Sequence, residues 1–169
     1  AALNRALSMA RGDAFAFTDD DVLLPENWIN EARRALDGHP ECDVFGGRVV
    51  PVPPEGMEFP SWVHWEDPYN IAEGPLVDHN KGGEVKSYHE PGMCTPIGAN
   101  FFARRRAFER IGPFGEVNAA TGGPATNEDS VWCNMAKNRG EAMLYVPDVA
   151  VRHVTPPGRM TKEYFSLYY

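Results

Sequence analysis

The sequence predicts an α/β domain in which a mixed, mostly parallel sheet is flanked by helices. In residues 1–50, segments with helical spacing of apolar residues alternate with short apolar runs, a pattern typical of parallel α/β sheets. Helical and strand-like segments return in residues 96–169, after an irregular stretch at residues 51–95. A chain of 169 residues has the length of one domain with one core.

The first 50 residues carry clear secondary-structure signals. Apolar residues at helical spacing predict a helix over residues 1–11. Because this pattern begins abruptly and without Met, we expect further sequence upstream of it. The aromatic run at residues 14–18 predicts a buried strand, and a helix over residues 25–38 leads to a second strand over residues 43–50.

The middle of the chain has another character. Residues 51–95 contain seven prolines, which interrupt regular structure. One interpretation is a poorly ordered surface insertion, and the other is an excursion that binds substrate. The second is favoured because disordered segments are poor in aromatic residues, whereas this stretch holds Trp62, Trp65, Tyr69 and Tyr88.

Regular elements return after this stretch. Residues 97–104 predict a strand and residues 105–111 a short helix. A glycine-rich loop then leads into a helix over residues 128–139. Two short strand-like pieces flank Pro147, and residues 158–169 predict a last amphipathic helix.

Composition limits the classes of function. The formal charge is −8, and there is no basic patch with interleaved aromatics, so we expect no nucleic-acid partner. The chain has three cysteines, Cys42, Cys94 and Cys133, and no CxxC pair. We therefore expect reduced thiols and a cytoplasmic protein. No apolar run has the roughly 18 residues of a membrane helix.

Three consecutive carboxylates, Asp19, Asp20 and Asp21, follow the first predicted strand. Open α/β sheets bind ligands at the carboxyl ends of their strands. Asp19 and Asp21 share a face if the strand geometry continues, so both can ligate one cation. Oxygen ligands suit Mg²⁺ or Mn²⁺, which commonly bridge to phosphate. The alternative, an N-cap for the helix beginning at Pro25, accounts for one aspartate but not for three.

Two further motifs carry candidate chemistry. Glu128 and Asp129 fall at the predicted start of a helix. They either complement the helix dipole or form a pair in which one carboxylate acts as a general base. His153 follows a predicted strand, where it is either structural or a metal ligand.

The order of these segments resembles the family 2 glycosyltransferases of the GT-A fold. The resemblance covers nearly the whole chain and is loosest in residues 51–95. It implies a Rossmann-like fold for nucleotide-diphospho-sugar transferases that lacks its N-terminal half. The matching positions are Asn4, the three aspartates, Gly98-Ala99-Asn100 with Arg104, the glycine-rich stretch closing at Glu128-Asp129, and Val146-Pro147-Asp148 to His153.

The resemblance implies an inverting, metal-dependent transfer of a sugar to an acceptor hydroxyl. Asp19, Asp21 and His153 would form the metal site, and the metal would stabilise the departing diphosphate. Asp129 would be the general base, and Glu128 would hold the acceptor or tune Asp129.

The resemblance also implies contacts to donor and acceptor. Gly98, Ala99 and Asn100 would line the donor pocket together with Asp19 and Asp20, although a packed strand edge is the alternative for the glycine, alanine and asparagine. Arg159 is either a contact to the diphosphate or a solvated helix charge. The candidates for stacking on an acceptor sugar are Trp62, Trp65 and Trp132. For Trp62 and Trp65, core or loop-anchoring roles are equally consistent.

The expected partners follow from the family. The donor would be a UDP-, GDP- or dTDP-sugar, and the acceptor a saccharide or lipid-linked glycan of cell-wall or polysaccharide synthesis, in contact with a membrane. Without the N-terminal half, the sheet would expose an edge through which copies could associate.

Two other functions compete with this interpretation. A catalytically incomplete module could bind carbohydrate or dimerise without turnover. A metal-dependent nucleotidyltransferase or phosphohydrolase could use the same acidic turn, but the chain has no P-loop, and the spacing from Glu128-Asp129 to His153 fits that class poorly.

Overall fold

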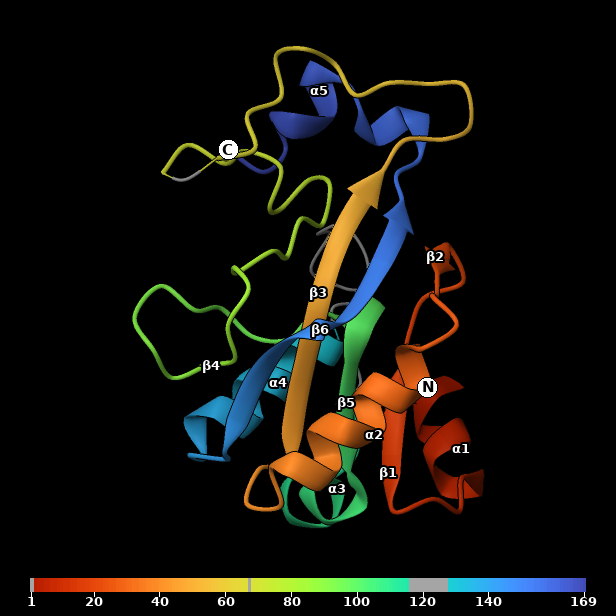
Figure 1. Ribbon diagram of the computed structural model, residues 1–169, viewed down its shortest axis with the longest axis vertical. Helices are drawn as coiled ribbons and strands as arrows, with labels where there is room; N and C mark the ends of the chain where they lie inside the picture. Colours follow the sequence, from red (N-terminus) through yellow and green to blue (C-terminus); the bar gives the residue numbers. More distant parts are fainter. Residues whose placement is uncertain (1, 67, 116–127) are drawn as a thin grey trace.

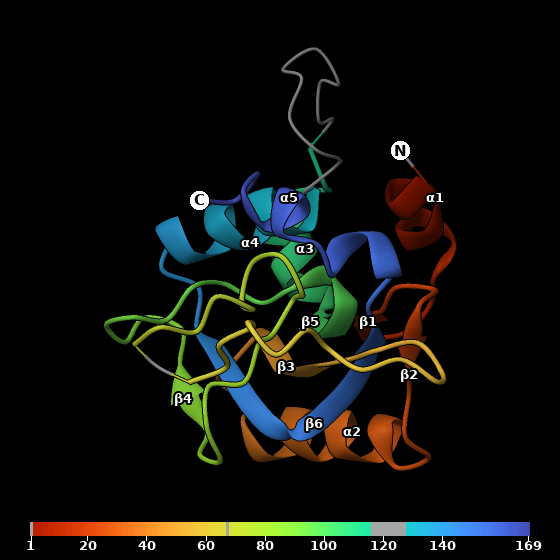
Figure 2. The same cartoon turned by 90° about the horizontal axis from the view of Figure 1, so that it is seen from above.

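The computed structural model describes residues 2–66, 68–115 and 128–169. A sheet lies between two layers of helices, with α2 on one face and α1, α3 and α4 on the other (Figures 1 and 2). The strand order is β1-β5-β3-β6-β2, and β4 also pairs with β6. The expected α/β architecture, a mixed sheet flanked by helices, is therefore confirmed.

The elements have the following bounds. The helices are α1 (Ala2–Met9), α2 (Trp28–Gly38), α3 (Arg105–Ile111), α4 (Glu128–Asn138) and α5 (Lys162–Phe165), with short 3-10 helices η1 (Gly98–Asn100) and η3 (Pro157–Arg159). The strands are β1 (Ala14–Phe17), β2 (Val22–Leu23), β3 (Val44–Val52), β4 (Lys86–Ser87), β5 (Phe101–Arg104) and β6 (Met143–Val154).

The long central pair of strands is parallel. β3 and β6 pair over the length of β3, whereas β5 lies antiparallel between β1 and β3. As a result β1, β3 and β6 run in the same direction and end at the same edge of the sheet (Figure 1). The short strands β2 and β4 pair antiparallel with β6.

Three predicted elements differ from the structure. The last helix, predicted over residues 158–169, is only a 3-10 turn at Pro157–Arg159 followed by the four-residue helix α5. The predicted strand over residues 97–104 begins as a 3-10 turn, and only Phe101–Arg104 is extended. The two pieces predicted around Pro147 are one strand, β6. Its register against β3 shifts between Gly47 and Arg48, so residues 147–149 bulge out of the ladder. The bulge accommodates Pro147, which has no N–H to donate.

Two apolar layers cover the faces of the sheet. On one face, α3 and α4 bury Ala107, Ile111, Trp132, Cys133 and Ala136, and α1 packs Leu3 and Leu7 against the same cluster. On the other face, α2 buries Trp28, Ala32 and Ala35. In α1 and α2 the buried positions are among those at helical spacing that predicted the helices, whereas Ile29, also predicted for the apolar face of α2, is exposed.

The excursion at residues 51–95 is packed rather than loose. Val63, Ala72 and Leu76 form a third apolar cluster with Phe165 of α5. A bridge between Val49 and His79 ties the excursion to β3. The chain segment that follows β3 therefore reaches the C-terminal helix and covers one end of the sheet (Figure 1).

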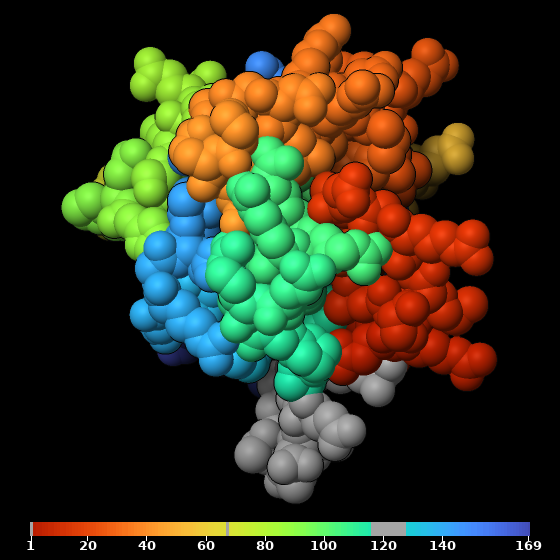
Figure 3. Space-filling view, turned by 90° about the horizontal axis from the view of Figure 1, so that it is seen from below, coloured from red at the N-terminus to blue at the C-terminus, as the bar shows by residue number. Residues whose placement is uncertain are grey.

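The opposite end of the molecule, where β1, β3 and β6 begin, is closed by α3 (Figure 3). Here Asp43 accepts hydrogen bonds from Arg106 and Arg110, and Arg110 also pairs with Glu141. Burial alone raises the pKa of Asp43, but the two guanidinium groups outweigh burial and lower it. Among the described residues, no helix is long and apolar enough to cross a membrane.

Candidate active site

The acidic turn lies at the carboxyl end of β1, as predicted. Directly after the turn, β2 pairs with β6 so that Val22 lies opposite His153. The backbone carbonyl of Asp21 also accepts a hydrogen bond from the N–H of Val154, at 2.9 Å. This pairing brings Asp21 next to His153, although the two are far apart in the sequence.

The side chains of Asp19, Asp21 and His153 converge. Each offers one ligand atom, and these atoms lie within 4.8 Å of one another. Asp21 Oδ1 is 3.3 Å from His153 Nε2. Within the described residues, Asp21 Oδ1, the atom next to His153 Nε2, is buried without a hydrogen-bond partner. A buried carboxylate oxygen that receives no hydrogen bond has a lone pair free to ligate a cation. These residues therefore fit a divalent metal.

The electrostatics of the turn point to the same conclusion. Burial raises the pKa of Asp19, and the neighbouring charge of Asp21 raises it further. Burial lowers the pKa of His153 although Asp21 opposes the shift, so the imidazole is neutral near pH 7 and has a lone pair to offer. The alternative of an N-cap does not hold, because the N-cap residue of α2 is Asn27.

A cavity of about 710 Å³ opens beside the acidic turn. It brings together most of the predicted site residues from four separate segments of the chain. The predicted residues that line it are Asp19, Asp20, Asp21, Gly98, Ala99, Glu128, Asp129 and His153. Arg159 lines the cavity too.

The backbone of Gly98 holds Asp129 in place at the edge of the cavity. Asp129 lies in the first turn of α4, and its Oδ2 accepts a hydrogen bond from the N–H of Gly98 at 2.6 Å. A Cβ at position 98 would lie only 2.5 Å from that oxygen, so the close approach requires glycine. Glu128 Oε2 is buried without a hydrogen-bond partner among the described residues.

Asn100 has a different place from the one predicted. It is fully buried and does not line the cavity. Its Nδ2 donates to the carbonyls of Arg48 and Val149, at 2.9 and 2.7 Å, and its Oδ1 accepts from Trp28 Nε1 at 3.0 Å. The amide therefore satisfies the carbonyls exposed by the β6 bulge, and its burial keeps it away from a sugar hydroxyl.

The three tryptophans predicted for the acceptor also lie elsewhere. Trp132 is fully buried and donates to the carbonyl of Gly112, so it belongs to the core and an acceptor does not reach it. Trp62 packs edge-on against Phe165, and Trp65 packs against Phe59. Neither Trp62 nor Trp65 is part of the cavity wall, so the loop-anchoring alternative describes them.

The aromatic wall of the cavity was not predicted. Tyr164 and Tyr168 line it, and their hydroxyls lie 3.2 Å apart. Glu73 and Val77 of the excursion line it as well. The tyrosines fall in the predicted C-terminal helix, but no local pattern indicated that this helix folds back over the carboxyl edge of the sheet.

Comparisons with known proteins identify the family and the fold. The profile of the family described as glycosyltransferase-like family 2 matches residues 1–167. No curated protein matches the chain. A solved structure, the mannosyltransferase PcManGT from Pyrobaculum calidifontis in complex with GDP-Man and Mn²⁺, is similar with a TM-score of 0.54 and 23% identity.

The extent of the similarity also matters. The match covers 92% of this chain but 36% of the mannosyltransferase chain, so this chain spans about a third of that protein's length. At this identity the likeness establishes the fold, which is the GT-A fold of a glycosyltransferase. The family profile, which extends over nearly every residue, establishes that the chain belongs to the glycosyltransferase-like family 2.

Proposed function

We propose that this chain carries the metal-binding and catalytic part of an inverting glycosyltransferase that moves a sugar from a nucleotide-diphosphate donor to an acceptor hydroxyl. One observation carries the proposal. A single cavity is lined by Asp19, Asp21 and His153, from the acidic turn and β6, and by Asp129, from the start of α4. Single displacement at an anomeric carbon needs both a metal site for the leaving group and a base, because these act on opposite faces of that carbon.

Asp19, Asp21 and His153 are the residues that would hold the metal. A mixed set of oxygen and nitrogen ligands suits Mn²⁺ better than Mg²⁺, which prefers oxygen alone. The metal would supply charge neutralisation for the departing nucleoside diphosphate. The Mn²⁺ and GDP-Man in the similar mannosyltransferase support this assignment.

Asp129 is the proposed general base. The N–H of Gly98 holds Oδ2, which orients the carboxylate and leaves Oδ1 to accept the proton of the acceptor hydroxyl. As that proton moves to Asp129, the acceptor oxygen forms its bond to the anomeric carbon, and the bond from that carbon to the diphosphate oxygen breaks. Glu128 lies beside Asp129 and would hold a second hydroxyl of the acceptor.

The walls of the cavity suggest how substrates are held. Gly98 and Ala99 leave room for the donor sugar because they carry little or no side chain. Arg159 has the charge to contact the diphosphate. Tyr164 and Tyr168 replace the tryptophans as our candidates for stacking on the acceptor, because their rings reach the cavity.

The donor is a UDP-, GDP- or dTDP-sugar, and the acceptor is a saccharide or lipid-linked glycan. All three cysteines are free thiols, consistent with a cytoplasmic setting at the membrane periphery, where lipid-linked acceptors are presented. Self-association would use β1, which pairs on one side with β5 and lies at the end of the strand order in the described residues.

Calorimetric titration with Mn²⁺ tests the proposal, with and without GDP, UDP and dTDP. We expect Mn²⁺-dependent binding of one nucleotide, lost in Asp21→Asn and retained in Asp37→Asn, a matched change on the exposed face of α2. Binding of Mn²⁺ without any nucleotide would instead identify a catalytically incomplete module. Unchanged Mn²⁺ affinity in Asp21→Asn would remove Asp21 from the metal site.

A further inference from the structure

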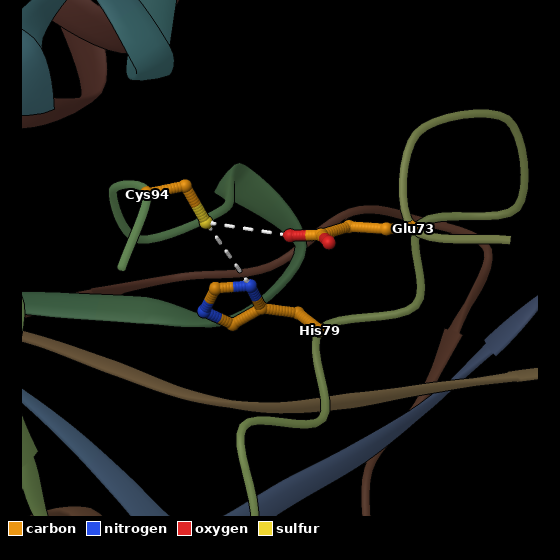
Figure 4. A group of neighbouring side chains, drawn as sticks. All are labelled: Glu73, His79 and Cys94. Atoms are coloured by element: carbon orange, nitrogen blue, oxygen red, sulfur yellow. Dashed lines mark hydrogen bonds between the residues drawn. The ribbon is translucent and has the colours of Figure 1, made fainter. Parts of the chain in front are cut away.

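A second group of ligating side chains lies in the excursion at residues 51–95. Glu73, His79 and Cys94 each offer one ligand atom, and these atoms lie within 4.8 Å of one another. Figure 4 shows the three side chains pointing toward a common point from separate segments of the excursion. None of them belongs to the metal set of the acidic turn, which consists of Asp19, Asp21 and His153.

We propose that Glu73, His79 and Cys94 form a zinc site. Thiolate, imidazole and carboxylate are each ligands of Zn²⁺, and three protein ligands leave a fourth position for water. Soft sulfur distinguishes this site from the acidic turn, whose oxygen-rich set suits Mn²⁺. The inference goes beyond the proposed sugar transfer and stands or falls separately from it.

The spacing of the ligand atoms matches tetrahedral coordination. Cys94 Sγ lies 3.7 Å from His79 Nδ1 and 3.8 Å from Glu73 Oε1. Zinc bonds of about 2.3 Å to sulfur and about 2.0–2.1 Å to nitrogen, at a tetrahedral angle, place these two ligands about 3.6 Å apart. Both separations that involve Cys94 Sγ are therefore already close to the tetrahedral value.

The histidine is already fixed in the orientation that coordination requires. His79 is fully buried, and its Nε2 lies 2.9 Å from the hydroxyl of Tyr88. Its backbone exchanges two hydrogen bonds with Val49 of β3. With a proton on Nε2 donated to Tyr88, Nδ1 presents its lone pair to Cys94 and Glu73. Outer partners of this kind commonly orient histidine ligands.

Without metal, hydrogen bonds hold the same groups together. The thiol of Cys94 can donate to Glu73, and Glu73 also pairs with the ammonium group of Lys81. Binding of Zn²⁺ replaces the thiol proton by a sulfur–zinc bond, and that proton goes to the buffer. The Glu73 pair with Lys81 must loosen or shift to the second carboxylate oxygen.

The site would brace the wall of the cavity. Glu73 lines the cavity, and Cys94 precedes the cavity residues Ile97 and Gly98 by only a few positions. A metal bonded to both segments would hold them at a constant separation. The predicted consequence is structural, and no step of sugar transfer depends on it.

Cobalt(II) is the probe, because a Co²⁺–thiolate bond gives a near-ultraviolet charge-transfer band that carboxylate and imidazole ligands do not give. We expect the chain to develop this band with Co²⁺ and to lose it on addition of one equivalent of Zn²⁺. Cys94→Ser should abolish the band, and Cys42→Ser, which removes a buried thiol remote from the cluster, should keep it. Far-ultraviolet circular dichroism checks that each variant is folded.

The outcomes separate clearly. No band in the unaltered chain, or an equal band in Cys94→Ser, would overturn the proposal. Tyr88→Phe tests the outer shell and should weaken Zn²⁺ affinity roughly 10–100-fold. Zn²⁺ should also slow the reaction of Cys94 with a thiol reagent, whereas equal rates with and without Zn²⁺ would contradict ligation. Loss of nucleotide binding with the band intact would count against the sugar-transfer proposal alone.

Discussion

At the scale of single residues, the candidate active site depends on one contact between a backbone and a side chain. Gly98 donates its N–H to Asp129 Oδ2 at 2.6 Å, and a side chain at position 98 would collide with that oxygen. The glycine predicted to line the donor pocket therefore has a second role, since it sets the position of the proposed base.

Gly98→Ala should impair catalysis more than metal binding. The added methyl group must push the Asp129 carboxylate away, and a displacement of about 1 Å of a catalytic group lowers the rate roughly 100-fold. We expect kcat for sugar transfer to fall by that factor while the Mn²⁺ affinity is unchanged. The matched control is Gly83→Ala, where a Cβ meets nothing within 4 Å. Equal kcat in the two variants would contradict the positioning role.

His79 should make stability depend on pH. Burial, with the charge of Lys81 adding to it, lowers the pKa of His79 from 6.5 to about 4. Between pH 4 and 6.5, His79 therefore binds a proton in the unfolded chain but stays neutral in the folded chain. The stabilising contribution is present above pH 6.5 and is lost as the pH falls toward 4, by about 3 kcal/mol at most.

Urea denaturation from pH 4 to 8, with EDTA present, measures this dependence. Asp43, whose pKa is lowered, also loses stabilisation in acid, and Asp19, whose pKa is raised, acts in the opposite direction. The difference between the unaltered chain and His79→Gln isolates His79. If both chains gave parallel curves between pH 6.5 and 4, His79 would not be the titrating group.

At the scale of elements, the bulge in β6 decides the shape of the sheet. Residues 147–149 leave the ladder, and the side chain of Asn100 crosses from η1 to bond the carbonyls of Arg48 and Val149. Gly47 makes room, because a Cβ there would lie 2.0 Å from the carbonyl oxygen of Val149. One buried amide thus joins β3, β6 and, through Trp28, helix α2.

Asn100→Ala should destabilise the fold. The change leaves two carbonyls and the Trp28 indole N–H buried without their partner, and each such group costs about 1–3 kcal/mol. We expect the free energy of unfolding to fall by about 3 kcal/mol or more, measured by urea denaturation. Asn134→Ala, at an exposed position on α4, is the control and should change it by less than about 0.5 kcal/mol.

The same variant distinguishes the two interpretations of Asn100. If Asn100 bonds the donor sugar, its replacement should lower donor affinity and leave stability unchanged. If Asn100 instead completes the bulge, its replacement should lower stability and leave donor affinity nearly unchanged. A stable Asn100→Ala chain with weakened donor binding would restore the original prediction.

At the scale of the whole molecule, the cavity is an assembly of distant segments. Its walls come from the acidic turn, the excursion, η1, the start of α4 and the C-terminal residues. A ligand that touches several of these segments binds only the folded chain, so it should stabilise the fold by mass action.

Mn²⁺ should therefore raise the thermal midpoint Tm, and EDTA should reverse the effect. At a metal concentration of about 100 times Kd, the expected stabilisation is about 2.7 kcal/mol. Differential scanning calorimetry of the unaltered chain and of Asp21→Asn provides the measurement. A similar rise of Tm in Asp21→Asn would show that Mn²⁺ acts somewhere other than the acidic turn.

Much of the candidate site could be predicted because its signals are local. Asp19 to Asp21 follow an apolar run, so they were placed correctly at the carboxyl end of a strand. Glu128 and Asp129 begin α4 as predicted. Strand ends and helix starts depend on a few neighbouring residues. Because these patterns are local, they can be predicted from the sequence.

Other parts depended on contacts between residues far apart in the chain. The two-residue strand β2 is too short to show a period, yet its pairing with β6 places Asp21 beside His153. Trp132 lies on the buried face of α4, and only the packing of α3 against α4 revealed this. The excursion has no periodic pattern, so its path along the cavity could not be foreseen.

The sequence by itself determined the α/β class, the family resemblance and the chemical types at the proposed centre, because these follow from local periodicity and from the order of motifs. Tertiary structure decided which of those residues meet. In the folded chain, Asn100 and Trp132 lie in the core. Tyr164 and Tyr168 line the cavity, and Glu73, His79 and Cys94 lie close together. These outcomes rest on long-range pairing and packing, whose energies depend on surfaces that exist only once the chain has folded.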